Sequence, residues 1–150
     1  MTNISLQEFA ERLSDQMSAM SREFLKKQSN ELYKGRITLP QFVILDFLFR
    51  HGGSKMTDLA HSMEVTTAAM TGIIDRLVKC GYVVRSFDPA DRRIIKISLK
   101  SKGAELVKKI TRQKRQMIID VFGKITQDER NEYLRILGLI HQILLKKENA

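Results

Sequence analysis

Apolar residues follow a helical period over the first part of the chain. Those that recur at steps of three and four are Leu6, Phe9, Leu13, Met17, Met20 and Phe24. This spacing aligns them along one face of a helix, which we expect to end near Gln28. Ser5 and Glu8 stand at capping-box spacing at the start of this helix. A polar stretch that contains a glycine, residues 30–36, then breaks the pattern.

A second helix is predicted after this break. Thr38 and Gln41 stand at capping-box spacing, and Pro40 lies in the first turn, where a missing amide hydrogen costs little. Its residues are apolar around much of the circumference, which is typical of a buried central helix. We expect it to end at Gly52 and Gly53.

Two short helices are predicted next, over residues 57–63 and 67–79, after a short extended piece at 54–56. Apolar positions give each helix an inner face, and Gly81 stops the second one. Val65 occupies the turn between them, where we expect it to fill the angle between the helices. This arrangement is typical of a helix-turn-helix.

The hydrophobic period then changes from near 3.6 to 2. Residues 82–87 and 95–99 are predicted to form two strands, joined by a turn at 88–93 with Pro89 ready for its second position. A helix-turn-helix followed directly by a basic-tipped hairpin is the layout of a winged helix. The chain is helical again after Gly103, so the predicted fold class is mainly α with a small β-wing.

The last helix has its own start signal. Thr126 and Glu129 form a third capping-box pair. The apolar residues that follow at helical spacing are Tyr133, Leu134, Leu137, Ile140, Ile143 and Leu144.

The helix-turn-helix and its wing carry a family resemblance. The residues concerned are Thr66-Thr67-Ala68-Ala69-Met70-Thr71-Gly72-Ile73-Ile74-Asp75-Arg76-Leu77, Gly81-Tyr82-Val83 and Asp88-Pro89-Ala90-Asp91-Arg92-Arg93. Together they resemble the signature of the MarR family of winged helix-turn-helix regulators, over roughly residues 39–103. The resemblance implies a single domain, with a DNA-binding region at 37–103 and dimerisation helices at 1–36 and 104–150.

Two positions depart from the family pattern. Most helix-turn-helix sequences carry Gly in the turn, whereas this chain has Glu64, which is less tolerant of positive φ. The family usually places Thr after the second wing strand, where this chain has Lys100. The cap of the following helix is therefore left open.

The resemblance also implies which side chains contact DNA. The residues implied to face base edges in the major groove are Thr66, Thr67, Ala68 and Thr71. Their short side chains offer hydroxyl hydrogen bonds and contacts with thymine methyl groups. Arg76 is implied to reach a phosphate, and Arg92 and Arg93 at the wing tip to enter or flank the minor groove. Asp88 and Asp91 are expected to hold Arg92 or Arg93 in position through hydrogen bonds within the wing. The alternative is that the turn is simply solvated and of mixed charge.

The charge of the chain agrees with a polyanionic partner. The 150 residues include 26 Lys and Arg against 17 Asp and Glu, a net charge of +9. An alternative from another class is a helical adaptor that binds acidic protein or lipid through a basic face. Such an adaptor would need aromatic anchors for a membrane surface, and the chain has no Trp. The basic stretch at 108–115 is interpreted as a solvated helix face.

Catalysis, metal binding and membrane insertion are not expected. We find no nucleophile–base pair, no glycine-rich phosphate loop and no metal motif, so the sequence predicts no enzyme, no cofactor and no metal. Residues 1–13 show no leader pattern, and no window approaches the ~20 apolar residues that a membrane span needs. The expected location is therefore the cytoplasm. Whether the single cysteine, Cys80, is a redox switch or a packed thiol stays open, although its place at a helix C-terminus disfavours the thiolate.

The resemblance implies a repressor that binds a pseudopalindromic operator in duplex DNA as a homodimer and is released by a small molecule or a stress signal. The candidate lining of an effector pocket is Met17, Met20, Phe24, Phe42 and Phe49. The alternative is that these five residues belong to the hydrophobic core.

Overall fold

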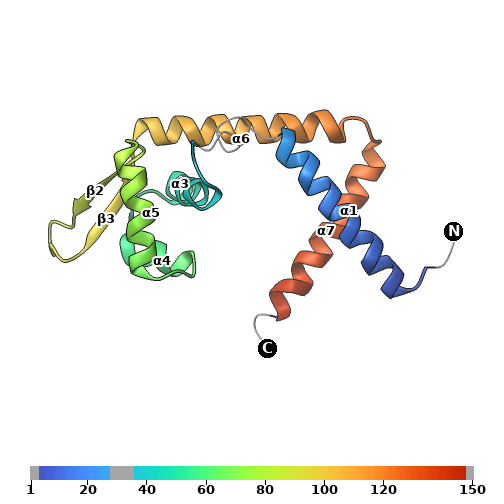
Figure 1. Cartoon of the computed structure of the whole chain (residues 1–150), viewed down its shortest axis with the longest axis horizontal. Helices are drawn as coiled ribbons and strands as arrows, with labels where there is room; N and C mark the ends of the chain where they lie inside the picture. Colours follow the sequence, from blue (N-terminus) through green and yellow to red (C-terminus); the bar gives the residue numbers. More distant parts are fainter. Residues whose placement is uncertain (1–3, 28–35, 148–150) are drawn as a thin grey trace. The chain divides into compact units, whose positions relative to one another are not determined.

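A computed structural model describes residues 4–27 and 36–147 of the chain. The protein is mainly helical, with one small antiparallel sheet, as predicted (Figure 1). Its elements are α1 (Leu6–Lys27), α3 (Leu39–His51), β1 (Ser54–Lys55), α4 (Met56–Ser62), α5 (Thr67–Lys79), β2 (Val83–Phe87), β3 (Ile95–Leu99), α6 (Ser101–Phe122) and α7 (Gln127–Lys147). The chain divides into two compact units, Met1–Gln113 and Lys114–Ala150.

The sheet has the strand order β1-β3-β2, and both pairings are antiparallel. β2 and β3 form the predicted hairpin, with Val83 opposite Leu99 and Phe87 opposite Ile95. β1 pairs with the other edge of β3, where Ser54 lies opposite Ile97. The sequence predicted an extended piece here, but not its strand partner, because the pairing joins residues more than forty positions apart.

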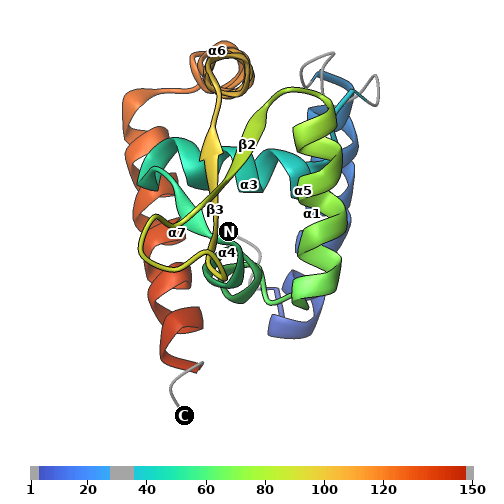
Figure 2. The same cartoon turned by 90° about the vertical axis from the view of Figure 1, so that its left-hand side faces the viewer.

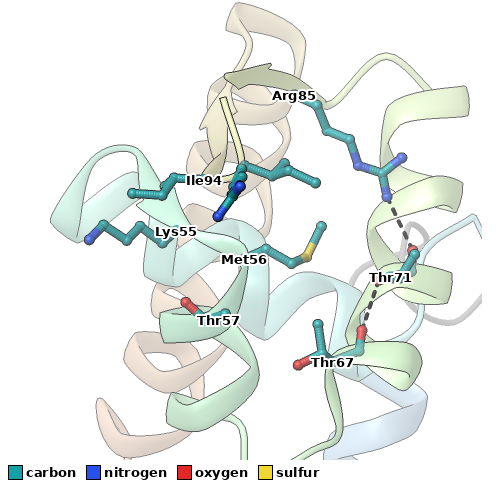
Figure 3. Close-up of a pocket in the computed structure, with 9 residues that line it drawn as sticks. Lys55, Met56, Thr57, Thr67, Thr71, Arg85 and Ile94 are labelled. Carbon is teal, nitrogen blue, oxygen red and sulfur yellow. Dashed lines mark hydrogen bonds between the residues drawn. The ribbon is translucent and has the colours of Figure 1, made fainter. Parts of the chain in front are cut away.

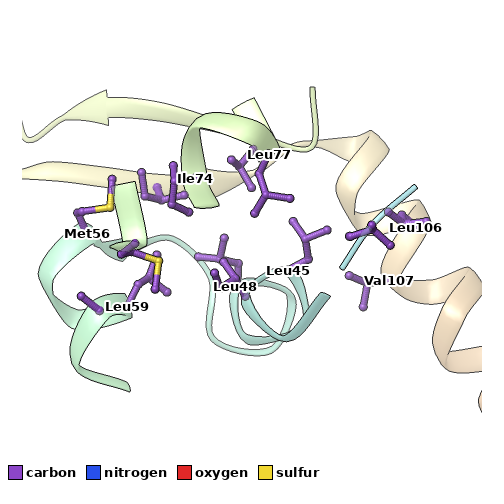
Figure 4. Close-up of a cluster of buried hydrophobic side chains, with 14 of the residues drawn as sticks. Leu45, Leu48, Met56, Leu59, Ile74, Leu77, Leu106 and Val107 are labelled. Carbon is purple, nitrogen blue, oxygen red and sulfur yellow. The ribbon is translucent and has the colours of Figure 1, made fainter. Parts of the chain in front are cut away.

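One hydrophobic core holds the helix-turn-helix and the sheet together (Figure 4). Its central side chains come from α3, α4, α5, both hairpin strands and the start of α6. The largest fully buried ones are Ile37, Ile44, Leu45, Leu48, Leu59, Met70, Ile74, Leu77, Ile97, Val83 and Val107. Burying one such side chain stabilises the fold by about 1.5–3 kcal/mol. The core continues through Ile110, beyond the end of the region at 37–103.

The start of α6 packs closely against the residue that precedes β2. A Cβ atom added to Gly103 would lie 2.4 Å from the Tyr82 carbonyl oxygen, so only glycine fits there without a shift. The same oxygen accepts a hydrogen bond from the Lys100 amide at 2.9 Å. Lys102 Nζ donates to the Cys80 carbonyl oxygen at 2.8 Å and lies 4.9 Å from the centre of the Tyr82 ring. These contacts join the end of α5, the start of β2 and the start of α6.

Two of the three predicted capping boxes are complete. Thr38 and Gln41 exchange both side-chain-to-backbone hydrogen bonds at the start of α3. Thr126 and Glu129 do the same at the start of α7. The hydrogen bonds from the Thr126 amide and hydroxyl hold the pKa of the Glu129 carboxyl below its ordinary value.

The capping box at the start of α1 is only half formed. The Ser5 hydroxyl accepts from the Glu8 amide at 3.1 Å. The Glu8 carboxylate binds the Arg12 guanidinium instead, at 2.6 Å. The predicted helix end at Gln28 and most of the break at 30–36 lie outside the described residues.

The turn of the helix-turn-helix differs from the prediction in one respect. Glu64 has φ of 53°, so this turn does require the left-handed conformation that glycine adopts more easily. Val65 was expected to fill the angle between the helices, but 37% of it is exposed. That prediction is wrong, because Val65 is not among the hydrophobic residues that pack against the core, whereas Met63 in the same turn is.

Candidate nucleic-acid interface

The first half of α5 turns a polar face away from the core. The Thr66 side chain accepts a hydrogen bond from the Ala69 amide at 3.2 Å and thereby caps the helix. The inner face of α5 is buried through Met70, Ile74 and Leu77. Thr67, Ala68 and Thr71 are therefore exposed on the outer part of the helix.

The hydroxyl groups on this face are not equivalent as hydrogen-bonding partners. Thr71 Oγ1 donates its proton to the Thr67 carbonyl oxygen at 2.8 Å (Figure 3). Since a hydroxyl has one proton, Thr71 can only accept a further hydrogen bond or offer its methyl group. Thr66 uses its hydroxyl oxygen as an acceptor, so its proton is still available to an external acceptor.

The wing tip is folded by the two aspartates. Asp88 Oδ1 accepts from the amides of Ala90 and Asp91, at 2.8 and 3.3 Å. Asp91 Oδ1 accepts from the amide of Arg93 at 2.9 Å. The aspartates thus bind backbone amides of the turn. The side chains of Arg92 and Arg93 are exposed, and neither guanidinium forms an ion pair with any residue that the structure describes.

A hollow of about 520 Å³ lies between the start of α5, the start of α4 and the wing (Figure 3). Its charged and hydroxyl-bearing lining residues are Lys55, Thr57, Thr67, Thr71, Arg85 and Arg93. Its remaining lining is the apolar Met56, Ile94 and Ile95. The lining of the hollow thus combines positive charges and hydroxyl groups with apolar side chains. α5 and the hairpin lie side by side around it (Figure 2).

Arg85 and Lys55 were not among the predicted site residues. Arg85 lies on β2 two residues after the buried Val83, so both side chains share the face of the strand that meets α5. The place of Arg85 two residues after Val83, on the same face of the predicted strand, was the signal that could have identified it. No sequence pattern marked Lys55, because its position beside the hollow depends on the pairing of β1 with β3.

The predicted effector-pocket residues do not line this hollow. On α1, Met17 and Met20 are exposed and Phe24 is half-buried. Phe42 packs against the hydrophobic core, and Phe49 is exposed on α3. The effector pocket therefore stays a prediction.

Arg76 and Cys80 lie in the last part of α5 and are both exposed. Arg76 is in the last turn, and Cys80 is the C-cap residue. Among residues 4–27 and 36–147, no cluster of three or more His, Cys, Asp or Glu could hold a metal ion. Within the same residues, no helix has the length and apolar character that a membrane span needs.

Comparison with known proteins identifies the family of this fold. The model of the MarR family matches residues 37–95. The HTH-type transcriptional regulator YsmB of Bacillus subtilis is 32% identical over 106 residues, which cover 70% of this chain and 73% of YsmB. The HTH-type transcriptional repressor NicR of Pseudomonas putida is 33% identical over 115 residues, 77% of this chain and 71% of NicR.

Solved structures share the same fold. The YusO protein of Bacillus subtilis superposes with a TM-score of 0.79 at 22% identity, covering 93% of this chain and 99% of YusO. Streptococcus pneumoniae FabT, solved in complex with DNA, superposes with a TM-score of 0.78 at 18% identity, covering 91% and 98%. With the sequence relatives above, these likenesses show that the chain belongs to the MarR family of winged helix-turn-helix transcriptional regulators.

Proposed function

We propose that the chain regulates transcription by binding a pseudopalindromic operator in duplex DNA as a homodimer. The observation that carries this proposal is the exposed first half of α5 beside a hairpin whose tip carries two exposed arginines, Arg92 and Arg93. A helix of this kind enters the major groove, and the basic hairpin beside it then meets the adjacent minor groove. The solved complex of FabT with DNA, in the same fold, supports this assignment.

The base-reading residues of this proposal are Thr66, Thr67, Ala68 and Thr71. Thr66 keeps a proton that it can donate to a base acceptor such as guanine O6 or thymine O4. Thr71 accepts from the amino group of cytosine or adenine, or contacts a thymine methyl group. These contacts discriminate less sharply than a bidentate arginine–guanine pair does.

The arginines supply the electrostatic part of binding. Arg76 reaches a phosphate from the last turn of α5. Arg92 and Arg93 enter or flank the minor groove, whose negative potential attracts guanidinium groups. Asp88 and Asp91 support them indirectly, because their carboxylates hold the backbone of the turn.

The homodimer is proposed from apolar surface on both terminal regions, 1–36 and 104–150. On α1, Leu6 is 83% exposed, and Phe9 and Leu13 are also exposed. The exposed apolar residues of α7 include Leu134, Leu137, Ile140, Ile143 and Leu144. Such faces are typical of an interface between subunits. A second copy of the chain would cover them and place two recognition helices about 34 Å apart, one DNA turn.

A signal that releases the protein from DNA completes the proposal. Two relatives, NicR and MdtR, are named as repressors, and a MepR-like protein of the same fold was solved with pseudoligands. We therefore propose repression that a small molecule or a stress signal relieves. The helical adaptor alternative finds no support among the relatives, which are named as transcriptional regulators.

The test begins with selection of an operator from random duplex DNA. The selected sequence should contain two related half-sites whose centres lie one helical turn apart. Affinity for this duplex and for an unselected one is then measured over a series of salt concentrations. Binding that weakens steeply with salt, and that favours the selected duplex, supports the proposal. Failure to enrich any sequence, or binding that salt leaves unchanged, contradicts it.

A further inference from the structure

We propose that Arg85 is a positioning residue that fixes the recognition helix α5 relative to the wing and does not itself contact DNA. It acts through an ion pair with Asp75 and a hydrogen bond to the backbone of Thr71. The proposal rests on the proposed function, since it concerns the two elements that would hold the operator.

Arg85 connects β2 to two consecutive turns of α5. One terminal nitrogen of its guanidinium lies 2.5 Å from Asp75 Oδ1. The other terminal nitrogen donates to the Thr71 carbonyl oxygen at 3.4 Å (Figure 3). Nε is buried and has no hydrogen-bond partner among the described residues. The guanidinium is thus anchored to α5 through both of its terminal nitrogens.

Only a planar guanidinium can make this pair of contacts. Thr71 and Asp75 are four residues apart, so they lie one above the other on the helix surface. The fork of an arginine side chain presents two donors in fixed geometry, whereas a lysine ammonium is a single point. The Arg85 side chain is 32% exposed and that of Asp75 is 57% exposed, so the ion pair is shielded from solvent mainly on its arginine side.

The residues that Arg85 contacts belong to the reading surface itself. Thr71 is one of the proposed base-reading residues, and its hydroxyl is bonded to Thr67 one turn earlier. The strand that carries Arg85 continues directly into the wing loop. A shift of β2 against α5 would therefore move the wing arginines relative to the base-reading face. Arg85 limits this shift.

The alternative role for Arg85 is a direct contact with a DNA phosphate, because the residue lines the positively charged hollow. The two roles predict opposite effects for Asp75→Asn. If Arg85 binds a phosphate, then removing the neighbouring negative charge tightens binding to every duplex. If Arg85 positions α5, then removing its anchor weakens binding to the operator.

The experiment compares Asp75→Asn, Arg85→Gln, Arg85→Lys and the double variant Asp75→Asn/Arg85→Gln, each as the full chain. Affinity is measured for the selected operator and for an unselected duplex over a salt series. Each single variant should lose roughly tenfold in operator affinity, as expected for coupled contacts. Affinity for the unselected duplex and its salt slope should stay unchanged. The double variant should bind no more weakly than Arg85→Gln alone.

A matched ion pair on α3 supplies the control. Arg50 Nε lies 2.8 Å from Asp46 Oδ2, away from the hollow and its lining. Asp46→Asn and Arg50→Gln make the same charge changes and should leave operator affinity unchanged. Thermal unfolding of all variants establishes that they are folded, and an operator loss that merely follows reduced stability overturns the proposal.

Two further results overturn the positioning role. One is a tighter complex of Asp75→Asn with both duplexes. The other is a salt slope that falls by about one phosphate equivalent in Arg85→Gln on unselected DNA. If the wild-type chain enriches no operator, then the proposed function itself fails. If the wild type binds its operator and the variants bind equally well, only the role of Arg85 fails.

Discussion

At the scale of single residues, the hydroxyl groups of α5 differ in what they can offer a base. Thr71 has donated its proton to the Thr67 carbonyl oxygen, whereas the Thr66 proton is not used within the helix cap. The recognition helix carries no longer polar side chain before Asp75. If α5 reads the bases as proposed, base discrimination by this chain depends on a few short side chains at well-defined positions.

We expect Thr71→Ala to reduce discrimination between operator and unselected DNA by about 1–3 kcal/mol, the range for one base contact. Phosphate contacts remain, so affinity for unselected DNA should be nearly unchanged. Thr71→Val keeps the methyl group and removes the hydroxyl, which separates methyl contact from hydrogen bonding. The measurement is the ratio of the two affinities. Equal losses on both duplexes would remove Thr71 from the reading surface.

The wing arginines give a second prediction. Arg92→Ala together with Arg93→Ala should weaken operator binding by about 2–4 kcal/mol and lower the salt slope by about one to two phosphate equivalents. The control is Lys108→Ala with Arg112→Ala, which makes the same change in charge on the exposed face of α6. If both pairs weaken binding equally, the effect is one of net charge and the wing has no special role.

At the scale of elements, the junction of β2 with α6 gives a prediction about stability. Gly103→Ala would place a Cβ atom 2.4 Å from the Tyr82 carbonyl oxygen and 2.7 Å from a methyl group of Leu99. Backbone atoms must shift to relieve this overlap, so we expect a loss of about 1–3 kcal/mol in the free energy of unfolding.

The control for this prediction is Gly72→Ala on α5. No atom lies within 4 Å of a Cβ at this position. Alanine in a helix interior should stabilise the free protein by about 0.5–1 kcal/mol relative to glycine. Thermal unfolding of both variants is the measurement. A Gly103→Ala variant as stable as the wild type would show that the backbone at the start of α6 can shift without cost to accommodate a Cβ atom.

Local signals allowed accurate prediction of some elements. The start and end of α5 agree with the predicted residues 67–79, because its cap residue Thr66 and the stop at Gly81 lie beside the helix in sequence. The hairpin could be predicted for the same reason, because the turn at 88–93 and the alternation of Ile95, Ile97 and Leu99 with polar residues lie in one short stretch of sequence.

Features that depend on contacts between elements were not predicted. The ion pair of Arg85 with Asp75 joins a strand to a helix, so neither residue is marked by its own neighbours in sequence. The exposure of Val65 likewise depends on how α4 and α5 fill the space between them. The roles of the threonines and wing arginines stay predictions, and the exposure of these side chains agrees with those roles.

At the scale of the whole molecule, the exposed apolar faces of the terminal helices carry the prediction about assembly. Leu137→Asp together with Ile140→Asp places two charges on the apolar surface of α7, where both residues are exposed in the single chain. If this surface is the dimer interface, the charges split or unfold the dimer and abolish operator binding, because buried unpaired charges are costly.

The measurement is the molecular mass in solution, with operator affinity determined on the same samples. The matched control is Glu132→Gln with Arg135→Gln, which changes a charged pair on the same helix, 2.6 Å apart, and should leave the dimer intact. A stable monomer that binds the operator with undiminished affinity would refute the proposed dimer.

The short side chains on the reading face of α5 also limit how much sequence information one subunit can extract. A mismatched base pair costs roughly 1–3 kcal/mol, while a genome offers about a million or more competing sites. A half-site read mainly by threonines and an alanine would recur many times by chance. In a dimer the sequence preferences for the two half-sites multiply. The combined site is long enough to be rare in a genome, whereas a single half-site is not. When dilution separates the subunits, we therefore expect the protein to lose its preference for the operator over near-matching sites before it loses binding to DNA altogether.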